Sequence, residues 1–177
     1  CGGAAKTSRR VGVAASCASG KEDSSLSDLL RVQYASHLAA RSELLADVLA
    51  VDDMKMNRAL IAHHATKLQL TCEQATDGDE AIALLYPGGK DGPAKRVGVV
   101  LCDLQMARIN GDAACRTLRE YGYAGPVLLL SGNKADEAEA ARLRECGFDG
   151  IFTKGELPNF RSLLAEYAEY MDCMAKK

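Results

Sequence analysis

Short apolar runs recur five times along most of the chain, and their alternation with longer stretches of mixed polarity constrains the fold most. The runs are Val48–Val51, Thr71–Ala75, Val97–Cys102, Val127–Leu130 and Gly150–Thr153. Most are apolar without the every-second-residue alternation of a half-exposed strand, which is typical of parallel strands covered on both faces. Five strand–helix units in a row predict a doubly wound α/β sandwich with a parallel sheet.

Helices are expected in the stretches that separate and follow the apolar runs. Their ranges are about Met54–Leu68, Asp79–Leu85, Gly111–Tyr121, Ala135–Cys146 and Pro158–Met174. The last range shows the helical period of 3.6 residues most clearly, at Phe160, Leu163, Leu164, Tyr167, Met171 and Met174. The segment Tyr86–Pro93 is rich in glycine and proline, which predicts a surface loop.

The N-terminal part of the chain has a different composition. Residues 1–24 are rich in glycine, alanine, serine and charge without an apolar period, which predicts a flexible leader. Residues 25–45 are expected to form a linker helix, because Ser25–Asp28 resembles a capping box and apolar residues follow at every fourth position. These are Leu26, Leu30, Tyr34 and Leu38. Residues 46–177 are then expected to form the α/β domain.

Composition excludes several classes of protein. The chain is 47% hydrophobic and 26% charged with a net charge of -2, which favours neither a nucleic-acid surface nor a polybasic membrane patch. No apolar run approaches the roughly 20 residues that span a bilayer. The seven cysteines are odd in number and form no CxxC pair, which favours a reducing compartment. We therefore expect a cytoplasmic domain without direct contact to nucleic acid or membrane.

Polar residues follow four of the five apolar runs at the point where each strand should end. Asp52 and Asp53 follow the first run, Asp103 the third and Ser131 the fourth, and Lys154 closely follows the fifth. Ligands of an open parallel sheet bind outside the carboxyl ends of its strands. Each residue alone has an ordinary explanation as a helix cap, a turn residue or a solvated charge. Their joint placement predicts a single site.

The residue types of this site suit phosphoryl chemistry. Three carboxylates in close proximity repel one another unless a cation intervenes, and Mg2+ suits a site of few carboxylates. With the metal bound, one carboxylate can act as a nucleophile toward phosphorus. Lys154 would balance the charge on the phosphoryl oxygens, and Ser131 could donate a hydrogen bond to one of them.

Four segments resemble the receiver domains of two-component response regulators. They are Val48–Arg58, Ala75–Ala81, Cys102–Met106 and Gly147–Lys154. The resemblance covers roughly residues 46–174 and includes the strand ends in their order along the chain. It implies a flavodoxin-like fold with strand order 2-1-3-4-5.

The resemblance also implies a role for each residue of the predicted site. Asp103 matches the phosphoryl acceptor, Ser131 the hydroxyl that moves toward the phosphoryl group, and Lys154 the lysine that pairs with it. The implied Mg2+ ligands are Asp53, Asp103 and the backbone carbonyl of Gln105, with Asp52 acting directly or through water. Gly132 matches the small residue that leaves space for the phosphoryl donor.

Three positions depart from the pattern of the family. Ala107 and Gly155 stand where the family usually has proline. Ile151 stands where the family has the tyrosine or phenylalanine that reports the state of the hydroxyl. Phe152 is adjacent, but successive strand residues face opposite sides of the sheet. The sequence therefore predicts that an aromatic switch of the usual kind is missing.

The expected function is that of a phosphoryl-accepting switch or relay. Asp103 would be phosphorylated in the presence of Mg2+ by a phosphohistidine on a histidine kinase or a histidine phosphotransfer protein. The resemblance implies no enzyme beyond self-phosphorylation and dephosphorylation. No DNA-binding domain follows residue 177, so the chain is expected to be a stand-alone regulator or the C-terminal receiver of a hybrid histidine kinase. The sequence leaves a homodimer open.

Two other functions stay open on the residues alone. A pseudo-receiver, which binds proteins without being phosphorylated, would agree with Ile151 and Gly155. A phosphohydrolase that uses an aspartyl phosphate would need a second aspartate at position 105, where Gln105 stands. None of the three histidines is expected to be catalytic. His64 is expected on a partly buried helix stripe with Leu60, Ile61 and Leu68, and His63 in solvent. His37 lacks the sequence context of a phosphorylated histidine.

Overall fold

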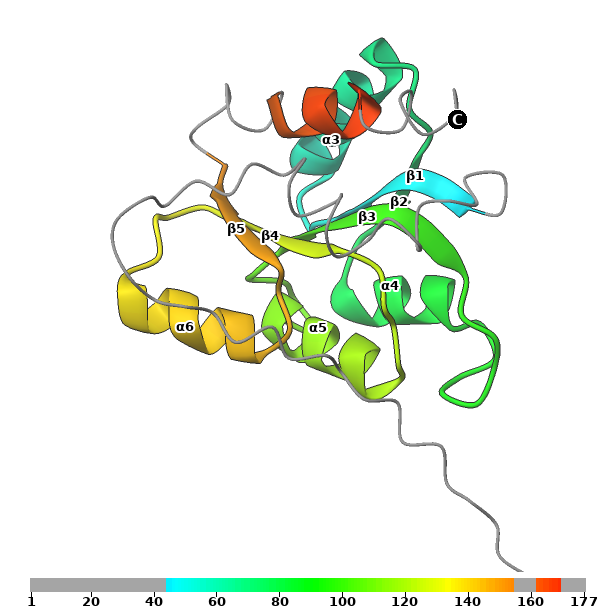
Figure 1. The fold of residues 1–177 in the computed structure, drawn as a ribbon, viewed down its shortest axis with the longest axis vertical. Coiled ribbons are helices and arrows are strands. Elements are labelled where there is room, and N and C mark those ends of the chain that lie inside the picture. The colour runs from blue at the N-terminus through cyan, green and yellow to red at the C-terminus, as the bar shows by residue number, and fades with distance from the viewer. Residues whose placement is uncertain (1–43, 155–161, 170–177) are drawn as a thin grey trace, which may run out of the picture.

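A five-stranded parallel sheet forms the centre of the protein (Figure 1). The computed structural model describes residues 44–154 and 162–169. The strands are β1 (Leu44–Val51), β2 (Cys72–Ala75), β3 (Arg96–Asp103), β4 (Val127–Ser131) and β5 (Gly150–Thr153). Their order is β2-β1-β3-β4-β5 and all four pairings are parallel, so the predicted flavodoxin-like order is confirmed.

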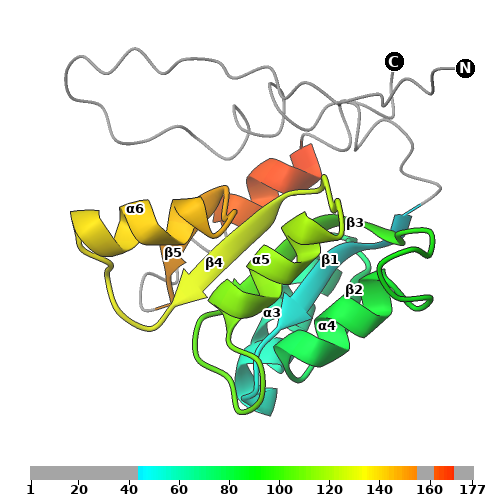
Figure 2. The same cartoon turned by 90° about the horizontal axis from the view of Figure 1, so that it is seen from below.

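Helices cover both faces of the sheet (Figures 1 and 2). The helices are α3 (Lys55–Lys67), α4 (Gly78–Leu85), α5 (Gly111–Glu120) and α6 (Glu137–Glu145), and residues 162–169 are also helical. Helix α3 and residues 162–169 lie on one face, whereas α4, α5 and α6 lie on the other. This two-sided cover confirms the doubly wound sandwich.

Neighbouring residues of each central strand enter two separate apolar clusters. Val48 of β1 packs toward Ile61 of α3 and the buried Tyr167, whereas Leu49 packs toward Leu85 of α4. Each fully buried leucine stabilises the fold by about 1.5–3 kcal/mol relative to an exposed one. Because both faces of a strand are buried, its apolar residues run without alternation, as the sequence indicated.

Strand β1 begins earlier than the apolar run from which it was predicted. It starts at Leu44, and so Leu44 and Leu45 are strand residues inside the range expected for the linker helix. The buried Asp47 interrupts the apolar pattern and hides the strand start. Its carboxylate accepts hydrogen bonds from the amide and the hydroxyl of Thr71, both at 2.8 Å. The predicted leader and the rest of the linker helix, residues 1–43, lie outside the described residues.

Two side chains differ from the prediction in their exposure. Tyr86, expected in a surface loop, is buried and packs edge-on against Tyr121 with ring centroids 5.4 Å apart. Leu60, expected on the buried stripe of α3, is 40% exposed, because Ile61 and Ala65 form the buried face of this helix. His64 is half-buried and His63 exposed, as expected.

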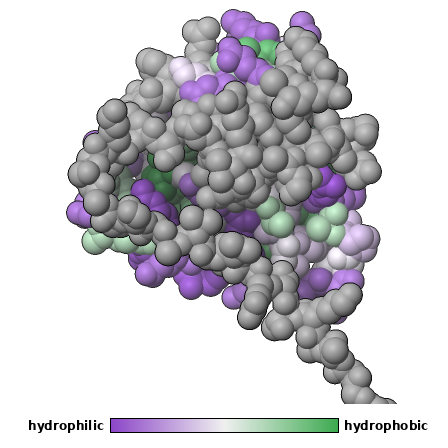
Figure 3. Space-filling view, viewed as in Figure 1, coloured by the Kyte–Doolittle hydropathy of each residue, from purple (hydrophilic) through white to green (hydrophobic). Residues whose placement is uncertain are grey.

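The described surface agrees with the composition. Hydrophilic residues predominate where it is visible in Figure 3, and the apolar areas among them are small. Of the helices formed by residues 44–154 and 162–169, none combines the length and apolarity needed to cross a membrane.

Gly98 of β3 lies where the C-terminal helical residues pack closely on the sheet. A Cβ atom at this position would lie 1.7 Å from the hydroxyl oxygen of Tyr167 and 2.5 Å from the carbonyl oxygen of Asp47. Tyr167 is fully buried and cannot swing away. We expect Gly98→Ala to lower the free energy of unfolding by about 1–3 kcal/mol, the usual cost of overpacking, measured by urea denaturation.

Gly132→Ala is the matched control for this substitution. A Cβ atom at Gly132 would have no heavy atom within 4 Å, so the same chemical change meets open space. Equal stability of the two variants would show that Tyr167 does not close this face of the sheet as described.

Candidate functional site

The carboxyl ends of the two central strands bring three carboxylates together. Asp52 and Asp53 directly follow β1, and Asp103 is the last residue of β3. The parallel register pairs Val51 with Cys102, so the residues that follow them lie side by side. One oxygen from each of Asp52, Asp53 and Asp103 can be chosen such that all three lie within 4.8 Å of one another. The predicted convergence of these carboxylates is therefore seen in the structure.

Lys154 bridges two of the three carboxylates from the end of β5. Its Nζ atom lies 2.7 Å from Oδ2 of Asp52 and 2.8 Å from Oδ1 of Asp103. Burial alone would lower the pKa of this amine, but the hydrogen bonds to Asp103 and Asp52 outweigh it and raise the pKa. Lys154 is thus held as a cation between two acids from other strands.

Asp52 is the most enclosed member of the cluster. Only 1% of it is exposed, and its oxygens accept hydrogen bonds from the amide of Met54 at 2.9 Å and from Nδ2 of Asn57 at 3.0 Å. Lys154 adds the ion pair. The protein itself therefore already uses both oxygens of this carboxylate.

Asp103 is buried at the end of β3. Burial raises its pKa above the usual range, although the hydrogen bond and the charge of Lys154 oppose the shift. The amide of Leu104 and the amine of Lys154 both contact Oδ1 of Asp103, at 2.8 Å each. Among the contacts between described residues, Oδ2 is the oxygen of Asp103 left for a ligand.

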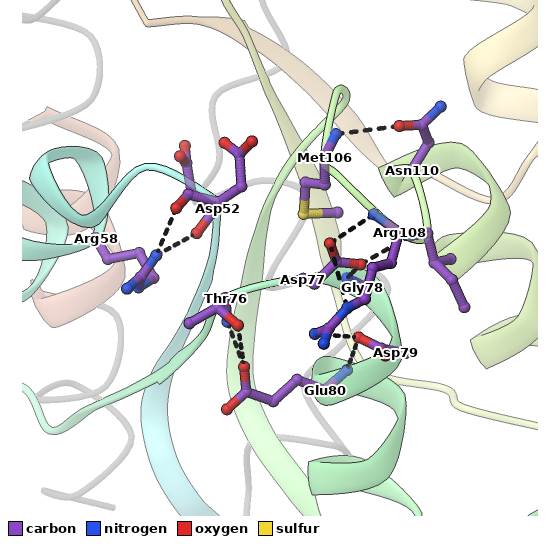
Figure 4. A network of polar contacts seen from close by, with 12 residues as sticks. Asp52, Arg58, Thr76, Asp77, Gly78, Asp79, Glu80, Met106, Arg108 and Asn110 are labelled. Atoms are coloured by element: carbon purple, nitrogen blue, oxygen red, sulfur yellow. Dashed lines mark hydrogen bonds and ion pairs between the residues drawn. The ribbon is translucent and has the colours of Figure 1, made fainter.

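The turn that carries Asp52 and Asp53 is fastened by the helix that follows it (Figure 4). Nη1 of Arg58 donates to the backbone carbonyls of Asp52 at 2.6 Å and of Asp53 at 3.1 Å. Asn57 and Arg58 were not predicted as site residues. Their position at the start of α3 could have indicated this role, because polar side chains there can reach back to the turn that precedes the helix.

Ser131 and Lys154 lie on neighbouring strand ends. Ser131 is the last residue of β4, and its carbonyl oxygen accepts from the amide of Lys154 at 2.7 Å. Its Oγ atom accepts from the amide of Asn133 at 3.2 Å. A Cβ atom on the next residue, Gly132, would have no other heavy atom within 4 Å.

The two residues before Thr153 face opposite sides of the sheet, as predicted. Ile151 packs on the side of α4, α5 and α6, whereas Phe152 packs on the side of α3. Phe152 therefore cannot take the place of the aromatic residue that position 151 lacks. Gly155 lies outside the described residues.

The donor atoms of the cluster suit a hard divalent cation. Carboxylate oxygens and a backbone carbonyl are ligands that Mg2+ prefers. Gln105, whose carbonyl was predicted as a further ligand, lies in the exposed loop two residues after Asp103. The set of ligand types fits Mg2+, and the buried Asp103 belongs both to this carboxylate cluster and to the ion pair with Lys154.

This fold and this cluster define an α/β module with a carboxylate site at the carboxyl edge of its parallel sheet. The family model described as the response regulator receiver domain matches residues 48–165. The chain therefore belongs to the response regulator receiver domain family of two-component systems, as the sequence motifs indicated.

Three known proteins illustrate the relationship. The sensor histidine kinase RcsC of Salmonella typhi is 32% identical over 123 residues, which cover 69% of this chain and 12% of RcsC. The autoinducer 1 sensor kinase/phosphatase LuxN of Vibrio campbellii is 30% identical over 89 residues, which cover 50% of this chain and 10% of LuxN. The structure of the chemotaxis protein CheY4 of Vibrio cholerae matches with a TM-score of 0.53 and 26% identity, over 64% of this chain and 89% of CheY4.

The raised pKa of Asp103 leads to a prediction for the metal-free protein. Because the fold disfavours the ionised carboxyl, Asp103→Asn should raise the free energy of unfolding at neutral pH. Asp103 is already ionised in the unfolded chain above its ordinary pKa of 3.8, so the gain should shrink as the pH falls through the raised pKa toward 3.8. Urea denaturation in chelator at pH 7 and pH 5 measures both effects.

Asp91→Asn provides the control, because Asp91 is an exposed loop residue with the same change of charge. This variant should leave stability nearly unchanged at both pH values. A destabilised Asp103→Asn protein would show instead that the ion pair with Lys154 outweighs the burial of the carboxyl.

Proposed function

We propose that this chain is a phosphoryl-accepting receiver of a two-component phosphorelay, with Asp103 as the acceptor. The observation that carries the proposal is the joint geometry of Asp103, its neighbouring carboxylates and the amine of Lys154. A buried carboxylate that is paired with a cation and has one unshared oxygen suits nucleophilic attack on phosphorus. The family of the chain supports the same reaction.

The proposed Mg2+ ligands are Asp53, Asp103 and the backbone carbonyl of Gln105. Asp52, whose oxygens already accept from Met54, Asn57 and Lys154, would act directly or through a water molecule. When bound, Mg2+ neutralises the crowded carboxylates and the charge that develops on the phosphoryl oxygens. The cation would thereby relieve the repulsion among the three adjacent carboxylates.

In the proposed transfer, a carboxylate oxygen of Asp103 attacks the phosphorus of a phosphohistidine. An oxygen–phosphorus bond forms, the nitrogen–phosphorus bond breaks, and the electron pair stays on the imidazole of the donor, which takes up a proton. Lys154 compensates the charge on a phosphoryl oxygen from its place beside Asp103. The Ser131 hydroxyl donates a hydrogen bond to another oxygen; its Oγ atom accepts from the amide of Asn133, which leaves the hydroxyl proton available.

The proposed partner is a histidine kinase or a histidine phosphotransfer protein. Met54, Met56 and Leu60 are the exposed apolar residues next to the acidic turn, with exposed fractions of 59%, 76% and 40%. Met56 and Leu60 are four residues apart on α3 and share one face of this helix. An apolar face beside the acceptor suits the docking of a helical donor domain.

We also propose a cellular compartment, a signalling output and a larger protein context for this receiver. Cys72, Cys102, Cys115 and Cys146 are free, which supports a reducing, cytoplasmic compartment. Ile151 supports an output that does not use an aromatic switch, such as passing the phosphoryl group on in a relay. Similarity to the receiver segments of RcsC and LuxN supports a place in a larger hybrid kinase.

Phosphorylation by a small donor tests the proposed acceptor. We expect the protein, incubated with Mg2+ and acetyl phosphate, to gain the mass of one phosphoryl group in intact mass spectrometry. Asp103→Asn should gain none, because an amide cannot form the acyl phosphate, and chelator should abolish the adduct on the wild type. A folded wild-type protein that binds Mg2+ but forms no adduct would instead favour the pseudo-receiver.

Substitution of the apolar face of α3 tests the proposed docking surface. Met56→Glu combined with Leu60→Glu should slow transfer from a phosphorylated histidine phosphotransfer domain roughly tenfold or more, since central interface residues often contribute more than 1 kcal/mol each. The reaction with acetyl phosphate should stay unchanged. Leu45→Glu is the matched control, because Leu45 is an exposed leucine at the opposite end of β1. Equal slowing by the control would refute this surface.

A further inference from the structure

The loop that follows Asp103 is held by a buried carboxylate from a different part of the chain. Asp77, at the start of α4, is only 2% exposed. Its Oδ1 accepts from the amides of Gly78 and Ile109, and its Oδ2 accepts from the amide of Arg108, all at 2.8 Å (Figure 4). Two amides of the β3–α5 loop are thus fastened to a residue about thirty positions earlier.

The same loop is closed by bonds within itself. The carbonyl of Leu104 accepts from the amide of Gly111 at 2.9 Å, and the side-chain oxygen of Asn110 accepts from the amide of Met106 at 3.0 Å. The Arg108 side chain adds an ion pair with Asp79 at 2.7 Å, but it is 58% exposed and contributes little. The bonds between loop amides and the buried Asp77 are therefore the stronger attachment.

Close backbone packing restricts the loop further. A Cβ atom at Gly78 would lie 2.5 Å from the carbonyl oxygen of Ile109, and one at Gly111 would lie 2.0 Å from the carbonyl oxygen of Asp103. The loop backbone thus touches the first residues of both α4 and α5. Gln105 sits inside the segment that these contacts enclose.

Asp77 stays ionised in this environment. Burial alone would raise its pKa, but the hydrogen bonds from the amides of Ile109, Arg108 and Gly78 outweigh it, and the pKa is lowered. A carboxylate that accepts several amide bonds is held in its charged form. The attachment therefore persists at neutral pH.

We propose that Asp77 is a positioning residue for Mg2+: by holding the amides of Arg108 and Ile109, it fixes the loop that presents the Gln105 carbonyl beside Asp103. The inference rests on the proposed function, because Gln105 is a ligand only if the site binds the metal. The loop contains Ala107, whose backbone no proline ring restricts. Proline at this position would stiffen the loop by restricting its backbone, and here the bonds to Asp77 supply that stiffness.

Two measurements on the full chain test this inference. The first is hydrogen exchange of the Arg108 and Ile109 amides in the metal-free protein, and the second is the Mg2+ dissociation constant from a titration with magnesium chloride. Asp77→Ala should speed exchange at both amides and weaken Mg2+ binding roughly tenfold or more, as loss of a group that orients a metal ligand does. Asp77→Asn keeps one accepting oxygen, so its effect should be smaller and its exchange faster mainly at Arg108.

Asp79→Ala is the matched control on the same helix turn. It removes the ion pair with the Arg108 side chain but leaves the bonds of the Arg108 and Ile109 amides in place. Exchange at these amides and Mg2+ affinity should both remain within about twofold of the wild type, the size of effect that an exposed ion pair can have.

A second substitution, Ala107→Pro, distinguishes a role of Asp77 in positioning the loop from a role in stability alone. The loop bonds to Asp77 and Asn110 come from the amides of Met106, Arg108 and Ile109, so proline at position 107 removes none of them. Ala107→Pro should recover part of the Mg2+ affinity lost in Asp77→Ala and change the wild type less. A role of Asp77 in stability alone would lower the melting temperature without this recovery.

The outcomes distinguish the inference from the proposed function. If Asp77→Ala, or Asp77→Asn where the alanine variant does not fold, binds Mg2+ as the wild type does, the inference is wrong while the proposed function stands. If the wild type itself binds no Mg2+, the proposed function fails, and the metal role of Asp77 fails with it. Unchanged exchange at Arg108 and Ile109 would overturn the attachment itself.

Discussion

The pairing of β1 with β3 is the constraint on which the site depends. Parallel strands place their carboxyl ends at one edge, and the register of these two strands sets Asp52 beside Asp103. Such proximity is unfavourable for two ionised acids unless positive charge lies between them. Lys154 supplies that charge from the end of β5, at 2.7 and 2.8 Å, which requires β4 to pair with both β3 and β5. The same crowding of carboxylates is the basis for the proposed Mg2+ site.

The two loops that carry the acids are held in the same way. Arg58 bonds to the backbone carbonyls of the β1–α3 turn, and Asp77 bonds to the backbone amides of the β3–α5 loop. In each case a charged side chain from a helix or its first turn satisfies backbone groups of a neighbouring loop. Polar groups that are buried without partners would be costly, so these bonds restrict the loops to one arrangement.

The sequence predicted the sheet and the carboxylate cluster better than it predicted the side-chain contacts around them. The runs of β1, β3 and β4 were recognisable because these strands are buried on both faces, and the acids because they follow the runs of β1 and β3. The start of β1 was missed since Asp47, which pairs with Thr71 twenty-four residues away, looks like an interruption. Tyr86 looked like a loop residue beside glycine and proline, but Tyr121 of another unit covers it. The misses at Asp47 and Tyr86 each depend on a partner from another unit of the chain.

The sequence by itself determined the strand order through its family motifs, the residue types at the strand ends, and the opposite facing of Ile151 and Phe152, because these follow from local patterns and their order along the chain. Only the tertiary structure decided which oxygen of Asp103 is shared with Lys154, how Arg58 fastens the acidic turn, and that Asp77 holds the loop after Asp103. The physical reason is that hydrogen bonds and ion pairs act over about 3 Å. Such contacts between residues far apart in the chain exist only after the sheet and its helices have packed.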